Sequence, residues 1–178
     1  QGRIAMYHAL GEGVEPLRIR TVGNAVFTRP EIAAVGFTQA EIEAGEVAAR
    51  TITMPLNTNP RAKMRSLQHG FVKLFCRATS GRVIGGVIVA PTASELILPI
   101  AMAVTNQLTV NQLADSFAVY PSLSGTITEA ARRLVAHDDL DDHVHDEASA
   151  HSNGNRVGKR HEDDREKSRD GLRQVTEV

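Results

Sequence analysis

Residues 70–77, GFVKLFCR, and residues 82–90, RVIGGVIVA, decide the fold of this chain of 178 residues. Both stretches are apolar and rich in β-branched and aromatic side chains, and residues 79–81, TSG, form a turn signal between them. The pattern predicts two strands joined as a hairpin. Its glycines do not open a helix, so the chain contains no glycine-rich phosphate loop and cannot hold a dinucleotide by itself in the Rossmann manner.

Further strands are predicted on the N-terminal side of this hairpin. Residues 21–36 are rich in strand-forming residues, and Pro30 interrupts the ladder, which is typical of an edge strand or of two short strands. Between this stretch and a further predicted strand over residues 47–56, Thr38 and Glu41 form a capping box that begins a short helix ending near Gly45. Residues 57–60, NTNP, predict a turn.

Helices are predicted on the C-terminal side. Thr92 and Glu95 form a second capping box, in which Glu95 caps an apolar helix that runs to about Asn106. Residues 109–112, TVNQ, begin another short helix. The last helix covers residues 126–136, and its single apolar stripe consists of Ile127, Ala130, Ala131 and Leu134. We expect residues 96–104 and this stripe to associate with another surface where they are exposed.

This order, strands followed by helices, predicts an α+β fold with an antiparallel sheet and helices packed on one face. Residues 1–10 predict a short helix broken at Gly11. Because an isolated helix of this length is marginal in water, we expect it to be the end of an element whose partners lie upstream. Residues 137–178 contain no aromatic residue and many charged ones, which indicates a disordered tail.

Composition and charge exclude several classes of function. The net charge is −1, without the strong basic excess of a nucleic-acid-binding protein. The longest strongly apolar stretch is too short to span a bilayer, and no signal peptide is visible, so we expect no membrane span and a cytoplasmic location. A single cysteine excludes an internal disulfide and a multi-cysteine zinc site. Cys76 lies in an apolar run and is predicted to be a small buried hydrophobic residue.

Polar side chains outside these patterns are interpreted as solvated. Arg61 and Lys63 follow the predicted turn, and a solvated cationic loop is favoured over an anion site. Glu31 lies beside Arg29, which suggests an ion pair at an interface. Imidazole and carboxylate groups together bind transition metals. The C-terminal tail has no apolar scaffold to fix such a site, so we predict no metal there despite its His137, His143, His145, His151 and His161 among Asp138, Asp139, Asp141, Asp142 and Asp146.

Several motifs, in their order along the chain, resemble the FAD-dependent pyridine nucleotide-disulfide oxidoreductases, which include dihydrolipoamide dehydrogenase and glutathione reductase. Residues 27–38, FTRPEIAAVGFT, resemble the family's Thr-x-Pro-Glu-(Ile/Val)-Ala-x-Val-Gly-x-Thr stretch. Residues 59–62, NPRA, resemble its Asn-x-Arg-Ala turn, and residues 93–97, ASELI, resemble a helix start. Residues 120–125, YPSLSG, resemble its His-Pro-Thr-x-Ser-Glu signature.

The resemblance covers residues 1–136 and implies a division of the chain. Residues 1–12 are expected to end a helix of a preceding FAD domain, and residues 13–136 to form the interface, or dimerisation, domain. Residues 137–178 are the disordered, acidic and His-rich tail.

The resemblance also implies a site at the subunit boundary, where Tyr120 and Pro121 reach the flavin of a partner subunit. Tyr120 stands at the family's catalytic His position, and Gly125 at the position of the Glu that orients this His. A tyrosine hydroxyl stays protonated at neutral pH, and glycine supplies no carboxylate. Ser122 and Ser124 have no adjacent base that could activate them. We therefore predict no catalytic residue in this chain and no dithiol–disulfide exchange.

The motifs are most similar to those of flavoprotein NAD(P)H:quinone reductases related to dihydrolipoamide dehydrogenase. This implies that the full-length parent is a homodimer that binds FAD and NAD(P)H in upstream domains and reduces a small acceptor such as a quinone. The chain begins at Gln1 rather than Met, which suggests a fragment or a processed chain. By itself it is predicted to bind no cofactor and to be inactive. The alternative is a free-standing or degenerate dimerisation module without chemistry.

Overall fold

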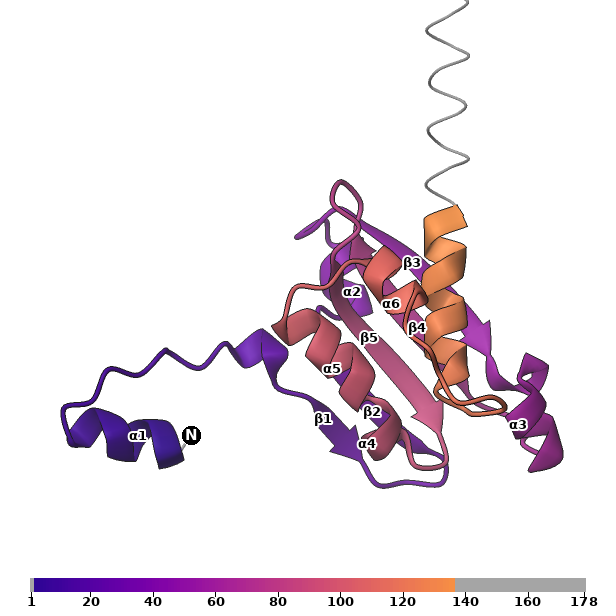
Figure 1. Ribbon diagram of the computed structural model, residues 1–178, viewed down its shortest axis with the longest axis horizontal. Coiled ribbons are helices and arrows are strands. Elements are labelled where there is room, and N and C mark those ends of the chain that lie inside the picture. Colours follow the sequence, from indigo (N-terminus) through magenta and orange to yellow (C-terminus); the bar gives the residue numbers. More distant parts are fainter. Residues whose placement is uncertain (1, 137–178) are drawn as a thin grey trace, which may run out of the picture. The chain divides into compact units, whose positions relative to one another are not determined.

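The computed structural model describes residues 2–136 of the chain (Figure 1). The strands are β1 (Asn24–Val26), β2 (Glu31–Gly36), β3 (Ala49–Pro55), β4 (Phe71–Arg77) and β5 (Val83–Ala90). The helices are α1 (Gly2–Ala9), α2 (Gln39–Glu43), α3 (Pro60–Met64), α4 (Ala93–Leu96), α5 (Leu98–Thr105) and α6 (Val110–Ala114), with short 3-10 turns η1 (Ile19–Thr21) and η2 (Leu56–Thr58). Residues 125–136 are also helical and are named the 125–136 helix below. The predicted tail lies outside the described residues.

The strands form one antiparallel sheet in the order β1-β2-β5-β4-β3. The predicted hairpin lies at its centre, because β5 pairs with β4 on one side and with β2 on the other. Pro30 separates β1 from β2, so residues 21–36 form two short strands rather than one edge strand. The predicted α+β fold with an antiparallel sheet is confirmed.

Glycine is required where β2 ends against β5. Gly36 lies opposite Gly85 in the register, and it has a φ of 83°. A Cβ atom at Gly36 would lie 2.1 Å from the carbonyl oxygen of Ile84. The same oxygen accepts a hydrogen bond from the N–H of Phe37 at 3.0 Å. The close approach of the two backbones therefore depends on the missing side chain.

The main core lies between the sheet and α4, α5, α6 and the 125–136 helix, which are drawn in front of the sheet in Figure 1. Leu74 and Ile88 enter it from the central strands, and Ile100 and Ile127 enter it from the helices. All four are fully buried, at 1% exposure or less. The apolar stripe of the last helix is therefore not exposed for association, because the chain's own sheet covers it.

The opposite face of the sheet carries the short helix α2. Its Ile42 packs against a small separate cluster formed by Val47, Phe75 and Ile84. The predicted capping box that begins α2 is confirmed, since Glu41 N–H donates to Thr38 Oγ1 at 3.3 Å and Thr38 N–H donates to Glu41 Oε2 at 2.7 Å. These bonds from Thr38, together with Arg20, lower the pKa of Glu41.

The predicted capping box at Thr92 and Glu95 is wrong. Thr92 adopts a left-handed conformation with a φ of 62°, and its side chain caps nothing. Instead, Glu31 of β2 accepts hydrogen bonds from the backbone N–H of Ser94 at 3.0 Å and from its hydroxyl at 2.7 Å. These two bonds, the backbone one first, lower the pKa of Glu31. Glu31 thus begins α4 from another element, and within residues 2–136 it forms no ion pair with Arg29.

The single helix predicted after Thr92 is two helices in the structure. It breaks at Ile97, between α4 and α5. Pro99 explains the break, because proline has no N–H that could bond to the carbonyl of Glu95, four residues earlier.

Candidate functional site

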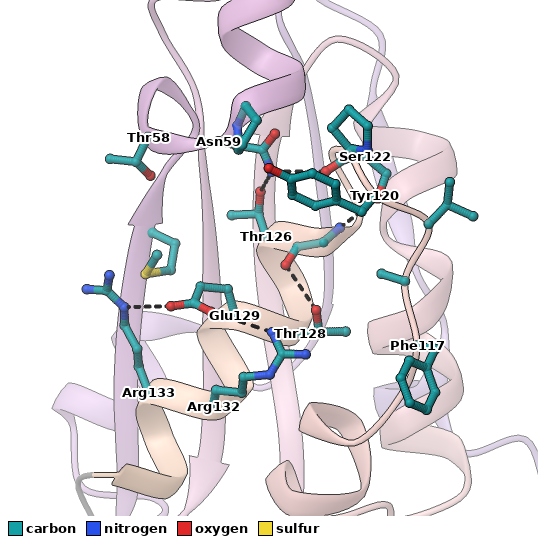
Figure 2. A pocket seen from close by; sticks show the side chains of 16 residues that line it. Thr58, Asn59, Phe117, Tyr120, Ser122, Thr126, Thr128, Glu129, Arg132 and Arg133 are labelled. Carbon is teal, nitrogen blue, oxygen red and sulfur yellow. Dashed lines mark hydrogen bonds and ion pairs between the residues drawn. The ribbon is translucent and has the colours of Figure 1, made fainter.

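A loop from α6 to the 125–136 helix presents large apolar side chains outward (Figure 2). Phe117 is fully exposed, and Val119 and Tyr120 are 79% and 81% exposed. The bond between Tyr120 and Pro121 is cis. Exposure of neighbouring large apolar side chains marks a surface that contacts another molecule. Residues 117–121 are therefore the centre of the candidate site, and they are named the Tyr120 loop below.

Asn59 joins this region to a distant part of the chain. Its amide group donates to the carbonyl oxygen of Ser122 at 2.9 Å and to the hydroxyl of Thr126 at 2.8 Å. Its side-chain oxygen accepts from the N–H groups of Arg61 and Ala62 at 2.8 and 3.3 Å, so the same residue caps the start of α3. All four hydrogen bonds are intramolecular, and those to Ser122 and Thr126 cross more than sixty residues of sequence.

The serines after Pro121 have structural partners. The hydroxyls of Ser122 and Ser124 lie 3.0 Å apart, and Ser122 Oγ accepts from the N–H of Gly125 at 3.1 Å. The hydroxyl of Thr128 donates to the carbonyl of Gly125 at 3.0 Å. These bonds tie together the first turn of the 125–136 helix, and they give the hydroxyls a helix-start role rather than a nucleophilic one.

A hollow of about 460 Å³ lies beside the loop. Tyr120, Asn59 and Thr58 line one end of it, and Arg132 and Arg133 line the other (Figure 2). Glu129 holds both arginines, with Arg133 Nε at 3.3 Å and Arg132 Nη1 at 3.6 Å. Because these groups are about half exposed, each pair contributes on the order of 1 kcal/mol or less.

The geometry contains no acid–base pair for thiol chemistry. Among the residues that line the hollow there is no histidine and no cysteine. The lining carboxylate, Glu129, is engaged by two arginines. Within residues 2–136 the hydroxyl of Tyr120 has no hydrogen-bond partner, so it can donate to a molecule that approaches the loop. The site can therefore supply an aromatic surface and one hydrogen-bond donor.

The other residues singled out in the sequence lie outside the Tyr120 loop and its hollow. Cys76 is buried within β4, as predicted. Arg61 and Lys63, predicted in a loop, lie exposed on α3. The sequence analysis did not predict this helix. Asn59 followed by Pro60 is nevertheless the signal of an N-cap with proline in the first helical position.

Residues 2–136 show neither a metal-ion cluster nor a membrane-spanning helix. In this part of the chain no three His, Cys, Asp or Glu side chains gather as they would around a metal ion. No described helix combines the length and apolar character needed to cross a bilayer. The histidines considered as metal ligands, from His137 onward, lie outside the described residues.

Comparison with known proteins identifies a family. The family model described as pyridine nucleotide-disulphide oxidoreductase, dimerisation domain, matches residues 22–131. A relative from Mycobacterium tuberculosis named NAD(P)H dehydrogenase (quinone) is 74% identical over 141 residues, which make up 79% of this chain and 29% of the relative. A dihydrolipoyl dehydrogenase from Haloferax volcanii is 36% identical over 135 residues, or 76% of this chain and 28% of that protein.

A solved structure has the same fold. The crystal structure of LpdA from Mycobacterium tuberculosis matches with a TM-score of 0.73 and 73% sequence identity, over 75% of this chain and 29% of that chain. The chain thus spans less than a third of the length of these relatives.

Proposed function

Because this chain belongs to the dimerisation-domain family of the pyridine nucleotide-disulphide oxidoreductases, we propose that it forms the subunit interface of a homodimeric, flavin-dependent NAD(P)H oxidoreductase. In this proposal the parent protein binds FAD and NAD(P)H in domains upstream of residue 13, and residues 1–12 end the FAD domain. The acceptor is a quinone or a similar small molecule. The name of the relative that is 74% identical supports this choice of reaction.

Tyr120 is the observation that carries the proposal. Its ring is 81% exposed, its hydroxyl has no partner within the described residues, and the loop around it is apolar. An aromatic body with one donor fits the edge of a flavin ring system and of a quinone, which carry apolar rings and carbonyl oxygens. A bound flavin supplies the redox chemistry of such enzymes. Tyr120 and Pro121 cover one side of the partner subunit's flavin, exclude water there, and offer the hydroxyl to a carbonyl oxygen.

The residues argue against dithiol–disulfide exchange as the reaction. That chemistry needs a base that takes a proton from a thiol, and a carboxylate that orients the base. Tyr120 and Gly125 stand at those two positions and supply neither group. Glu129 pairs instead with Arg132 and Arg133.

The interface is proposed to include α5 as well as the Tyr120 loop. Leu98 and Met102 of α5 are 60% and 55% exposed, although their neighbours Ile100 and Ala103 are completely buried. A second copy of the chain would remove these side chains and Phe117 from water. Full burial of an exposed side chain of this kind contributes about 1.5–3 kcal/mol, and the gain is smaller for Leu98 and Met102 because each is already partly buried.

The reaction is tested with the full-length protein that contains this chain, assayed for NAD(P)H-dependent reduction of the quinone menadione and of the disulfide lipoamide. We expect menadione to be reduced and lipoamide not, and residues 1–178 alone to be inactive with both. Lipoamide reduction as fast as menadione reduction would contradict the proposal. Inactivity of the full-length protein with every quinone and dye would favour the alternative of a dimerisation module without chemistry.

The role of Tyr120 is tested by Tyr120→Phe in the same protein. Loss of one hydrogen-bond donor is expected to lower kcat with menadione about tenfold, with the KM for NAD(P)H unchanged. Tyr7→Phe is the control, because Tyr7 lies on α1 and is 42% exposed, away from the Tyr120 loop in sequence. Equal kcat values for Tyr120→Phe and wild type would remove the hydroxyl from the proposed role.

A further inference from the structure

We propose that Asn59 is the positioning residue for Tyr120, an inference that rests on the proposed function of that tyrosine for its kinetic test. Asn59 lies between η2 and α3, far from Tyr120 in sequence. Its side chain nevertheless holds the chain immediately after the Tyr120 loop (Figure 2).

Among residues 2–136, the Tyr120 loop makes no hydrogen bonds of its own. The last backbone bond before it is from Ser116 N–H to the carbonyl of Leu113 at 3.3 Å. Within the described part of the chain, residues 117–121 neither donate nor accept a hydrogen bond. The first fixed point after Ser116 is therefore the carbonyl of Ser122, which accepts from Asn59 at 2.9 Å. That anchor lies two residues after Tyr120.

Asn59 is well placed to act as a rigid anchor. It is half-buried, and Thr126, which also accepts from it, is only 3% exposed. Two N–H groups of α3 fix the side-chain oxygen, so the amide plane cannot rotate without losing bonds at both ends. Asn59 thus fixes the position of the Ser122 carbonyl relative to α3 and to the buried first turn of the 125–136 helix. An exposed side chain on a loop without other hydrogen bonds needs such an anchor, because it must be held in one position to contact a ligand with the same geometry each time.

The variant Asn59→Asp separates the proposed positioning of Tyr120 from the capping of α3. A carboxylate can still accept from the N–H groups of Arg61 and Ala62, so α3 keeps its cap. It cannot donate, so it loses the bond to the Ser122 carbonyl and faces that oxygen with a like charge. Thr38→Ala is the control for any effect of capping, because it removes a side-chain cap from α2, away from the Tyr120 loop.

The activity-independent readout is the mobility of Tyr120. The chain contains 2 tyrosines and no tryptophan, so Tyr7→Phe leaves Tyr120 as its single strong emitter. In this background of the 178-residue chain, time-resolved fluorescence anisotropy is expected to decay faster after Asn59→Asp and to be unchanged after Thr38→Ala. Unchanged decay after Asn59→Asp overturns the inference, whatever the activity of the full-length protein.

The kinetic readout is a double-mutant cycle in the full-length protein. Asn59→Asp is expected to slow menadione reduction about tenfold in the wild-type background and less than twofold in the Tyr120→Phe background, because it acts through that side chain. Flavin reduction by NAD(P)H is expected to stay unchanged in both. Equal losses in both backgrounds would indicate a general structural effect and overturn the inference.

A second variant covers the case in which Asn59→Asp does not fold. Thr126→Val removes the other acceptor of the same amide group and leaves the Asn59–Ser122 bond in place. It is expected to show a smaller change of the same kind in anisotropy and in the cycle, and its failure to do so counts against the inference. If the wild-type protein reduces no quinone, the proposed function fails, and the anisotropy result alone decides the role of Asn59.

Discussion

Gly125 is a position where the backbone does not require glycine. It occupies the first position of the 125–136 helix, where a Cβ atom would meet only Ser122 Oγ at 3.6 Å, and its φ is not positive. Glycine is therefore not required there by the backbone. A residue with a side chain, such as the glutamate predicted there by the family resemblance, would fit this position without backbone strain.

Gly125→Ala is accordingly predicted to stabilise the protein. Alanine reduces the conformational entropy of the unfolded chain, and the gain is about 0.5–1 kcal/mol. Gly81→Ala is the matched control, because its Cβ would also lie 3.6 Å from the nearest atom but its φ is 60°. We expect chemical denaturation to show a gain for the first variant and a loss for the second. A loss at both positions would mean that Gly125 is needed for its backbone.

Glu31→Gln is predicted to destabilise the protein in a pH-dependent way. Hydrogen bonds from Ser94 lower the folded-state pKa of Glu31 from its ordinary value of 4.5. The carboxylate therefore contributes stability that is fully present above pH 4.5 and is lost as the pH falls through the lowered pKa. The stability difference between wild type and variant should be largest near neutral pH and should vanish in acid.

Urea denaturation at several pH values measures this difference. Glu95→Gln is the control, since Glu95 lies exposed on the same helix and has no cap bond. A difference for Glu31→Gln that is independent of pH would show that the charge of Glu31 does not act through Ser94.

At the scale of elements, the end of the β2–β5 pairing leaves no room for a side chain at Gly36. Gly36→Ala is predicted to cost about 2–4 kcal/mol, because it adds strain at a positive φ and a clash with the backbone of Ile84 that no side-chain rotation relieves. The control is Gly23→Ala, where the nearest atom would lie 3.9 Å away. Thermal denaturation should separate the two variants clearly. A loss at Gly36 as small as at Gly23 would mean that β2 can shift away from β5.

Element boundaries also show where local sequence signals compete with tertiary contacts. The capping box at Thr38 forms because Thr38 and Glu41 are local partners, and Arg20 binds the other carboxylate oxygen of Glu41 at 2.9 Å. The identical pattern at Thr92 fails because Glu31, brought close by the pairing of β2 with β5, already caps α4. No local pattern contains that information, because the two residues lie 63 positions apart.

At the scale of the whole molecule, we expect the exposed face of α5 to contact a second copy of the chain. Met102→Glu on α5 is predicted to weaken the dimer of the full-length protein, because a charge would be buried in an apolar contact. Val26→Glu is the matched control, since both side chains are 55% exposed and Val26 lies on the edge strand β1.

Sedimentation velocity at micromolar concentration measures the outcome. We expect the mass to fall toward that of one subunit for Met102→Glu and to stay dimeric for Val26→Glu. The reverse result would place the interface at the sheet edge instead of at α5 and the Tyr120 loop.

The sequence by itself determined the antiparallel sheet and the central hairpin, and it has Tyr120 and Gly125 where the resemblance predicts His and Glu. These features follow from alternation, turn residues and residue identity, all of which are local. Only the tertiary structure decided that the stripe of the last helix faces its own core, that Glu31 caps α4, and that Asn59 anchors the chain beside Tyr120. Each of these depends on atoms far apart in sequence that meet only after the sheet has formed, and no short-range pattern specifies such a meeting.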